Sequence, residues 1–99
     1  MVQINWTYQS KIDLKDIFEY ISRDSKKYAQ IQNLRILKRT QILKKLPYSG
    51  KVIVEIHRED LRELVEGNYR IIYKIVSESR VDILTVHHSS RDLNKRNKS

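Results

Sequence analysis

The sequence predicts an α+β domain with an N-terminal strand, then a two-helix antiparallel hairpin that packs on a mostly antiparallel β-sheet. Three observations support this fold class. β-prone segments flank a two-residue turn at Gly67-Asn68, two earlier segments carry apolar residues at helical spacing, and residues 2–6 alternate as a strand does. We expect residues 1–99 to form a single domain, because no internal repeat or low-complexity block divides them.

The turn at Gly67-Asn68 defines the register of the first strand pair. Glycine in the first loop position indicates a type II′ turn, which requires a positive φ there and matches the twist of the strands. Val65 is then expected opposite Arg70, and Glu63 opposite Ile72.

A third strand follows a polar break at residues 77–80. If Val76 is opposite Val81, Arg70 is opposite His87, and a slip of one residue would exchange the two faces. The predicted core face carries Leu64, Ile71, Tyr73, Ile75, Leu84 and Val86. The predicted mixed face, a candidate binding or reaction surface, carries Glu63, Val65, Arg70, Ile72, Lys74, Ile83, Thr85 and His87.

The helical segments have recognisable ends. Thr7 can cap a first helix with an apolar stripe of Leu14, Ile17, Phe18 and Ile21, and Asp24-Ser25 supplies a break and a second cap. The second helix is predicted to end before Pro47, with Ala29, Ile36, Leu37, Leu43 and Leu46 facing inward. Asn33 and Thr40 fall on the same stripe, which suggests that this stripe is only partly covered.

Composition excludes several classes of protein. There is no cysteine, and the three histidines lack metal-ligand spacing, so we expect neither a metal nor another cofactor. No leader or long apolar run is apparent, which predicts a cytoplasmic protein without a membrane segment.

The net charge of +8 is unevenly distributed along the chain. No acidic residue lies between Asp24 and Glu55, although eight lysines and arginines do, and residues 93–99 form a basic tail that we expect to be loose. This asymmetry indicates an acidic partner, either nucleic acid or an acidic protein segment.

The sheet segments also carry a family resemblance. The order Arg62-Glu63-Leu64, Gly67-Asn68-Tyr69-Arg70-Ile71-Ile72-Tyr73, His87-His88 and Arg91-Asp92-Leu93 resembles the RelE/ParE superfamily of type II toxin–antitoxin toxins. The likeness extends to Trp6, Asp13-Leu14, Tyr20-Ile21 and Leu46-Pro47 with Gly50. It implies the α+β architecture described above and a small acidic antitoxin as partner, in a toxin–antitoxin hetero-oligomer.

Enzymatic members of the superfamily cut messenger RNA on the ribosome. If the chain is such a nuclease, the resemblance makes Arg70 the phosphate clamp, with His87 or His88 as acid or base and Glu55 or Glu63 as a further candidate base. Arg70 could instead pair with Glu63 or Glu66 on the sheet surface, and the histidines could be structural. The cations and the tyrosine of RelE-like nucleases are absent, because the corresponding positions are Leu61, Glu63, Ser89 and Lys95.

The chain looks more like the ParE branch, whose members poison DNA gyrase by binding. The resemblance implies an interaction surface, for which the candidates are Arg62, Arg70, Lys74, Arg91, Lys95 and Arg96. We therefore predict a gyrase-directed toxin, with a ribosome-dependent endonuclease and an inactive, antitoxin-binding module as alternatives. Residues 91–93 could equally pack back on the sheet, with Leu93 as anchor.

Overall fold

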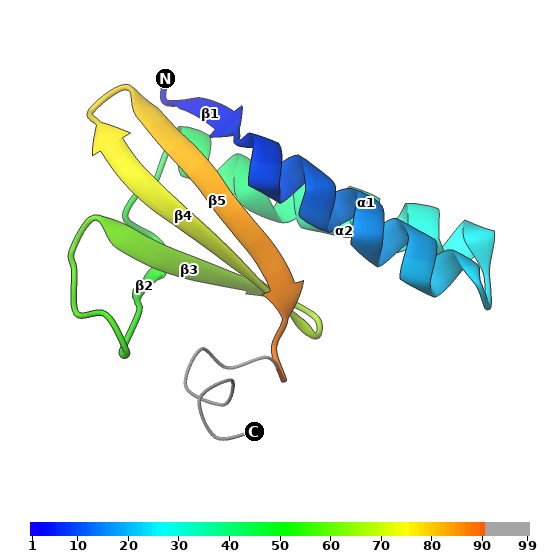
Figure 1. Ribbon diagram of the computed structural model, residues 1–99. Helices are drawn as coiled ribbons and strands as arrows, with labels where there is room; N and C mark the ends of the chain where they lie inside the picture. Colours follow the sequence, from blue (N-terminus) through cyan, green and yellow to red (C-terminus); the bar gives the residue numbers. More distant parts are fainter. Residues whose placement is uncertain (91–99) are drawn as a thin grey trace.

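Five strands form one sheet and two helices cover one of its faces (Figure 1). The computed structural model describes residues 1–90. In chain order the elements are β1 (Gln3–Trp6), α1 (Tyr8–Ser22), α2 (Lys26–Thr40), the 3-10 helix η1 (Gln41–Lys44), β2 (Lys51–Val52), β3 (Leu61–Glu66), β4 (Tyr69–Ser77) and β5 (Arg80–His88). The strand order is β1-β5-β4-β3-β2, in which β1 is parallel to β5 and the other pairs are antiparallel. The predicted fold class is confirmed.

Both predicted caps begin the helices. The Thr7 side-chain oxygen accepts the Ser10 N–H at 3.3 Å, and the Ser25 oxygen accepts the Tyr28 N–H at 3.1 Å. Each bond satisfies one of the backbone donors that a helix start leaves without a helical partner. The hairpin formed by α1 and α2 extends beyond the edge of the sheet (Figure 1).

The second helix ends earlier than the sequence predicted. It stops at Thr40, whose hydroxyl donates to the Leu37 carbonyl at 2.7 Å, and the chain tightens into η1. The change in helical pitch after Thr40 moves later side chains, including Leu46, off the predicted stripe, whereas Leu37 lies inside α2 and is exposed independently of that change. Leu37 and Leu46, both predicted to face inward, are 38% and 57% exposed.

The predicted stripe is incompletely covered, because Leu37 and Leu46 are exposed and Asn33 is half-buried, but Thr40 does not lie at an uncovered position. Thr40 is fully buried, and the Asn33 side-chain amide donates to the Leu14 carbonyl of α1 at 3.2 Å. The Asn33 amide nitrogen thus links α2 to α1, and the Thr40 hydroxyl is satisfied within α2.

The hairpin register is confirmed near its turn. Gly67 has a φ of 58° and Asn68 has no positive φ, as a type II′ turn requires. Val65 pairs with Arg70, and Arg70 pairs with His87.

A β-bulge in β5 corrects the rest of the predicted register. Ile72 pairs with Thr85 but Tyr73 pairs with Ile83, so Leu84 is the extra residue, and Val81 lies opposite Ile75 instead of Val76. Ile83 is therefore fully buried in the core, although it was predicted on the mixed face. Leu84, predicted in the core, is only half-buried.

The core lies between the hairpin and the sheet. Its buried residues are Ile36, Leu43, Leu64, Tyr69, Ile71, Tyr73, Ile75, Val81, Ile83 and Val86. Ile53 and Ile72 are also buried, outside this cluster.

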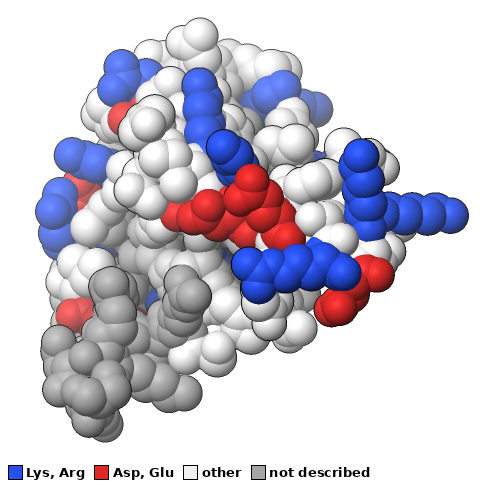
Figure 2. Space-filling model, turned by 45° about the vertical axis from the view of Figure 1, so that its right-hand side comes forward, with Lys and Arg blue, Asp and Glu red and all other residues white. Residues whose placement is uncertain are grey.

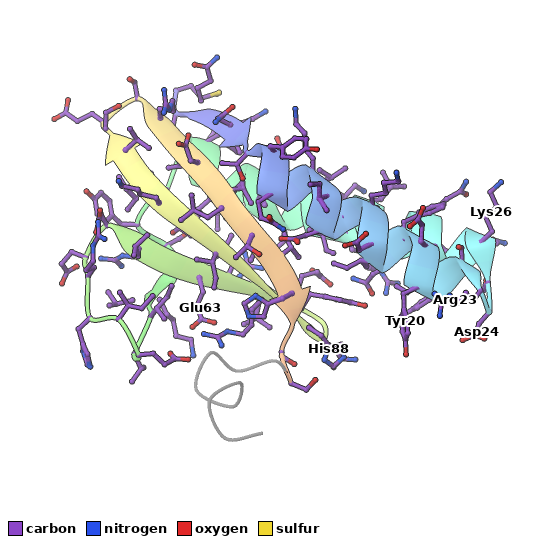
Figure 3. All side chains as sticks on the ribbon, in the orientation of Figure 1. Tyr20, Arg23, Asp24, Lys26, Glu63 and His88 are labelled. Atoms are coloured by element: carbon purple, nitrogen blue, oxygen red, sulfur yellow. The ribbon has the colours of Figure 1, made fainter. Side chains whose placement is uncertain are left out.

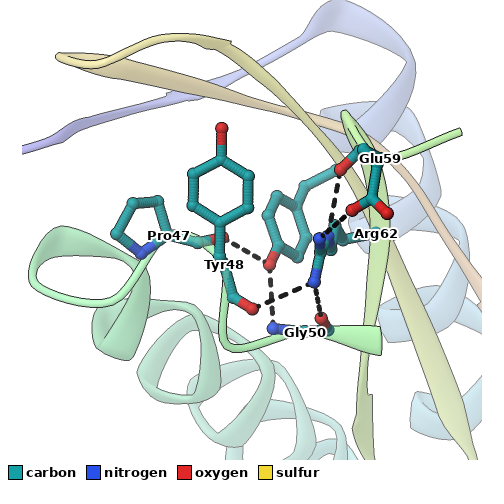
Figure 4. A network of polar contacts seen from close by, with 6 residues as sticks. Pro47, Tyr48, Gly50, Glu59 and Arg62 are labelled. Carbon is teal, nitrogen blue, oxygen red and sulfur yellow. Dashed lines mark hydrogen bonds and ion pairs between the residues drawn. The ribbon is translucent and has the colours of Figure 1, made fainter. Parts of the chain in front are cut away.

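A polar network ties the segment before β2 to the sheet (Figure 4). The Tyr73 hydroxyl donates to the Pro47 carbonyl at 2.6 Å and accepts the Gly50 N–H at 3.0 Å. Gly50 is required here, because a Cβ would lie 2.6 Å from the Tyr73 hydroxyl and 2.7 Å from the Glu63 carbonyl oxygen. Burial raises the pKa of the Tyr73 hydroxyl.

Candidate functional site

Arg70 is held by two carboxylates on the sheet face away from the hairpin. Its Nε and Nη2 donate to the two Glu63 oxygens at 2.8 and 2.9 Å, and its Nη1 lies 3.6 Å from Glu55. The side chains of Arg70, Glu63 and Glu55 are only 11%, 14% and 17% exposed. Bidentate, charge-assisted hydrogen bonds of this kind are among the stronger hydrogen bonds in proteins.

The chemistry of this cluster differs from that of a phosphate clamp. Two carboxylates around one guanidinium leave a net negative charge, which repels a phosphate. The ion pair with Glu63 is present, whereas an ion pair with Glu66 is not found among residues 1–90. The nuclease role of Arg70 remains a prediction, and such a role would require these carboxylates to move or to change protonation state.

Arg62, a second predicted binding residue, makes several contacts within the chain. It donates to the carbonyls of Glu59, Tyr48 and Gly50, forms a 2.6 Å ion pair with Glu59, and lies 5.1 Å from the centre of the Tyr48 ring (Figure 4). Its side chain is 14% exposed. These contacts favour a structural role for Arg62, which connects β3 to the segment before β2 and to the loop between β2 and β3.

The remaining predicted binding residues divide into two groups. Lys74 is half-buried on β4, and its register neighbours are Leu61 on β3 and Asp82 on β5. Arg91, Lys95 and Arg96, together with the basic tail at residues 93–99, lie outside the described residues.

The two histidines end β5 at the opening of a groove. His87 is half-buried, and it lies opposite Arg70. His88 is exposed at the end of β5 (Figure 3). Its Nδ1 lies 2.8 Å from the Ser90 hydroxyl, and its ring meets the Tyr69 ring edge-on, with 5.5 Å between the ring centres. Their possible acid or base role stays a prediction.

The groove runs between α1 and the end of β5 and has a volume of about 1180 Å³. It was not predicted from the sequence. Its lining residues are Gln9, Asp13, Asp16, Ile17, Glu19, Tyr20, Arg23, Tyr69, Thr85, Val86, His87, His88 and Ser90. The sequence feature that could have indicated this groove is the three-residue spacing of Asp13, Asp16 and Glu19, which places three carboxylates along one side of α1.

Within residues 1–90, no group of three or more histidine, cysteine, aspartate or glutamate side chains is placed to hold a metal ion. None of the helices in that part is long and apolar enough to cross a membrane.

Comparison with known families identifies the class of protein. Residues 4–93 match the family model described as the ParE toxin of the type II toxin–antitoxin system, parDE. Since the match spans most of the chain, the chain belongs to the ParE toxin family, within the RelE/ParE superfamily of type II toxin–antitoxin toxins. The resemblance inferred from the sheet residues is confirmed. A comparison with curated protein sequences found no match.

Solved toxin structures share the fold. The chromosomal ParDE system from P. aeruginosa has a chain that superposes with a TM-score of 0.71 at 16% identity, covering 89% of this chain and 96% of that one. YafQ from E. coli strain BL21(DE3) gives 0.55 at 17% identity, with 91% and 96% covered. The RelBE2 toxin–antitoxin complex from Mycobacterium tuberculosis gives 0.51 at 26% identity, with 88% and 96% covered.

Proposed function

We propose that this toxin arrests growth in the cytoplasm by binding and poisoning DNA gyrase, and that a small acidic antitoxin neutralises it. The observation that carries the proposal is the state of Arg70. A nuclease of this fold would need that guanidinium at the scissile phosphate, but Glu63 and Glu55 hold it in a cluster of net negative charge. A protein target does not need a phosphate site at this place.

The antitoxin is expected to bind the outward face of α2 and η1. Leu34, Leu37 and Ile42 are 57%, 38% and 39% exposed there. Basic residues lie on the same two helices, which contain Arg35, Lys38, Arg39 and Lys44. Exposed apolar side chains among cations suit an acidic amphipathic segment, which would bury the leucines and pair with the lysines. These exposed residues replace Asn33 and Thr40 as the basis for the expected partner.

A ribosome-dependent messenger RNA endonuclease is the second candidate function. One observation favours it: Arg70 of β4 lies opposite His87 of β5, so a cation and a titratable imidazole share one end of the sheet. The solved structures of YafQ and RelBE2 have the same fold, but fold alone does not define an activity.

Parallel assays on the purified protein distinguish these functions. The protein is incubated with gyrase and supercoiled DNA, and separately with ribosomes translating a defined message. Trapped cleaved DNA with intact message is the expected result. Cut message with unaffected gyrase would establish the nuclease instead. An effect in neither assay, with binding to the protein encoded by the neighbouring reading frame retained, would identify an inactive binding module.

A further inference from the structure

The groove between α1 and β5 has a fixed base and a charged wall. The Asp13 carboxylate joins the two elements, because its Oδ2 accepts hydrogen bonds from the Thr85 hydroxyl at 2.5 Å and the Val86 N–H at 2.9 Å. Its Oδ1 accepts the Gln9 side-chain amide at 2.9 Å. Asp13 therefore holds the groove in shape.

Asp16 and Glu19 are the carboxylates available to a ligand. Both are exposed, both line the groove, and within residues 1–90 neither forms an ion pair or a side-chain hydrogen bond. Figure 2, which turns the end of the helix hairpin toward the viewer, shows acidic side chains gathered in the middle of this face with Lys and Arg around them. A protein of net charge +8 thus presents a local acidic surface.

Aromatic rings provide the rest of the wall. Tyr20 is 69% exposed on α1, and the Arg23 guanidinium already lies 5.9 Å from its ring centre. Figure 3 shows Tyr20 and Arg23 projecting from the hairpin toward the side on which His88 lies. Burial raises the pKa of the Tyr69 hydroxyl, and the nearby Tyr28 and Tyr20 hydroxyls contribute, so this ring stays neutral.

We propose that this groove is a docking site for a basic segment of a partner protein, with Asp16 and Glu19 pairing with its Lys or Arg side chains. The exposed Tyr20 ring adds a cation–π contact to the same side chains, and the half-buried Ile17 contacts their aliphatic stems. Nucleic acid and an acidic antitoxin do not fit, because their charges would face the exposed carboxylates. The groove is therefore a second interaction surface, separate from the outward face of α2 and η1.

The test measures binding of a fluorescent decapeptide of alternating arginine and glycine to the full chain by anisotropy at low salt. Glu19→Lys is compared with Glu78→Lys, which makes the same charge change in the loop between β4 and β5, at the opposite end of these strands. Reversing a charge in the groove should raise the Kd about three- to tenfold more than reversing the control charge. Adding salt should weaken binding of the peptide to the unmodified chain.

Three results would overturn the proposal. The peptide could fail to bind the unmodified chain at low salt. Both variants could weaken binding equally, which would mean that net charge alone controls it. A third measurement follows the NMR signals of Tyr20 and Glu19 in a full chain carrying Lys95→Glu, Arg96→Glu and Lys98→Glu. If these changes alone shift the signals, and the peptide then binds more tightly, the occupant is this chain's own basic segment and not a partner.

Discussion

The Glu63 carboxylate of β3 accepts two hydrogen bonds from the Arg70 guanidinium of β4, at 2.8 and 2.9 Å. Both side chains are more than four-fifths buried, and Glu55 approaches the same guanidinium from the loop after β2. The three residues thus connect this loop and two strands, so a substitution at any one of them affects both the charge of the sheet face and its packing.

Arg70→Ala should destabilise the fold by about 2 kcal/mol, because it leaves two poorly exposed carboxylates facing each other. An ordinary surface substitution, in comparison, changes stability by only about half a kcal/mol. Urea unfolding followed by circular dichroism measures the loss. Arg80→Ala is the matched control, since Arg80 pairs with Asp82 but is 49% exposed. Equal losses in the two variants would contradict the buried character of the Arg70 pair.

The effect of Arg70→Ala on growth arrest has to be compared with its effect on stability, because loss of the fold would also abolish arrest. A charge-retaining Arg70→Lys variant keeps one cation between the carboxylates while losing the two-pronged geometry. If arrest follows stability across Arg70→Ala, Arg70→Lys and the unmodified chain, Arg70 is structural. Loss of arrest in a variant of unchanged stability would show that Arg70 acts directly in toxicity.

Tyr73→Phe should cost about 1 to 3 kcal/mol, because it leaves the Pro47 carbonyl and the Gly50 N–H without their partner. Tyr48→Phe provides the control, since the Tyr48 side chain is 59% exposed and its hydroxyl has no partner within residues 1–90. Denaturant midpoints at matched slopes separate the two variants. A negligible loss for Tyr73→Phe would mean that water replaces both bonds.

Alkaline pH should destabilise the protein through the same hydroxyl. Burial raises the pKa of Tyr73 in the folded state above the value of about 10 expected in the unfolded chain. The associated stabilisation is thus fully present below pH about 10 and is lost as pH rises through the folded-state pKa. The unfolding free energy of the unmodified chain should fall more steeply above pH 10 than that of Tyr73→Phe, in which the raised pKa of Tyr69 still contributes. Parallel slopes would exclude Tyr73 as a source of the pH dependence.

Substitutions on the outward face of α2 test the proposed antitoxin surface. Leu34→Glu with Leu37→Glu should abolish co-purification with the protein of the neighbouring reading frame, because two carboxylates replace apolar contacts and repel an acidic segment. Tyr8→Glu changes an 80% exposed residue of α1 and should leave co-purification intact. Retention of the complex by the leucine variant would place the antitoxin elsewhere.

The predictable part of the fold was what short-range patterns encode. Thr7 and Ser25 indicate helix starts because their side chains can cap a helix. Gly67 indicates a turn because glycine readily adopts a positive φ. The β-bulge at Leu84 has no such signal in the sequence. Ile83 and Leu84 are both apolar, so either of them could face the core. Thr40 ended α2 through a hydrogen bond to its own helix, which its place on an apolar stripe does not indicate.

The candidate site was less predictable, because it depends on which charges meet in space. Glu55 and Arg70 are separated by fifteen positions and meet only when the loop after β2 packs on the sheet. The groove similarly requires α1 to lie beside β5, which Asp13 secures by bonds to Thr85 and Val86. The sequence indicated Arg70, its possible pairing with Glu63 and the histidines, but it did not indicate that Glu55 also contacts Arg70 or that a groove lies beside the histidines.

Removal of residues 91–99 should reduce growth arrest more than replacement of the two histidines, if the toxin acts by binding gyrase. The reason is charge: Arg91, Lys95, Arg96 and Lys98 suit an acidic or DNA-bearing target. His87, in contrast, lies opposite Arg70, whose guanidinium is held by the Glu63 and Glu55 carboxylates, and these oppose binding of a phosphate. A truncation before Arg91 is compared with the double change His87→Ala and His88→Ala, with growth scored at matched soluble expression. Arrest that survives the truncation but disappears with the histidine changes, in a protein of unchanged stability, would establish the nuclease reading in place of gyrase binding.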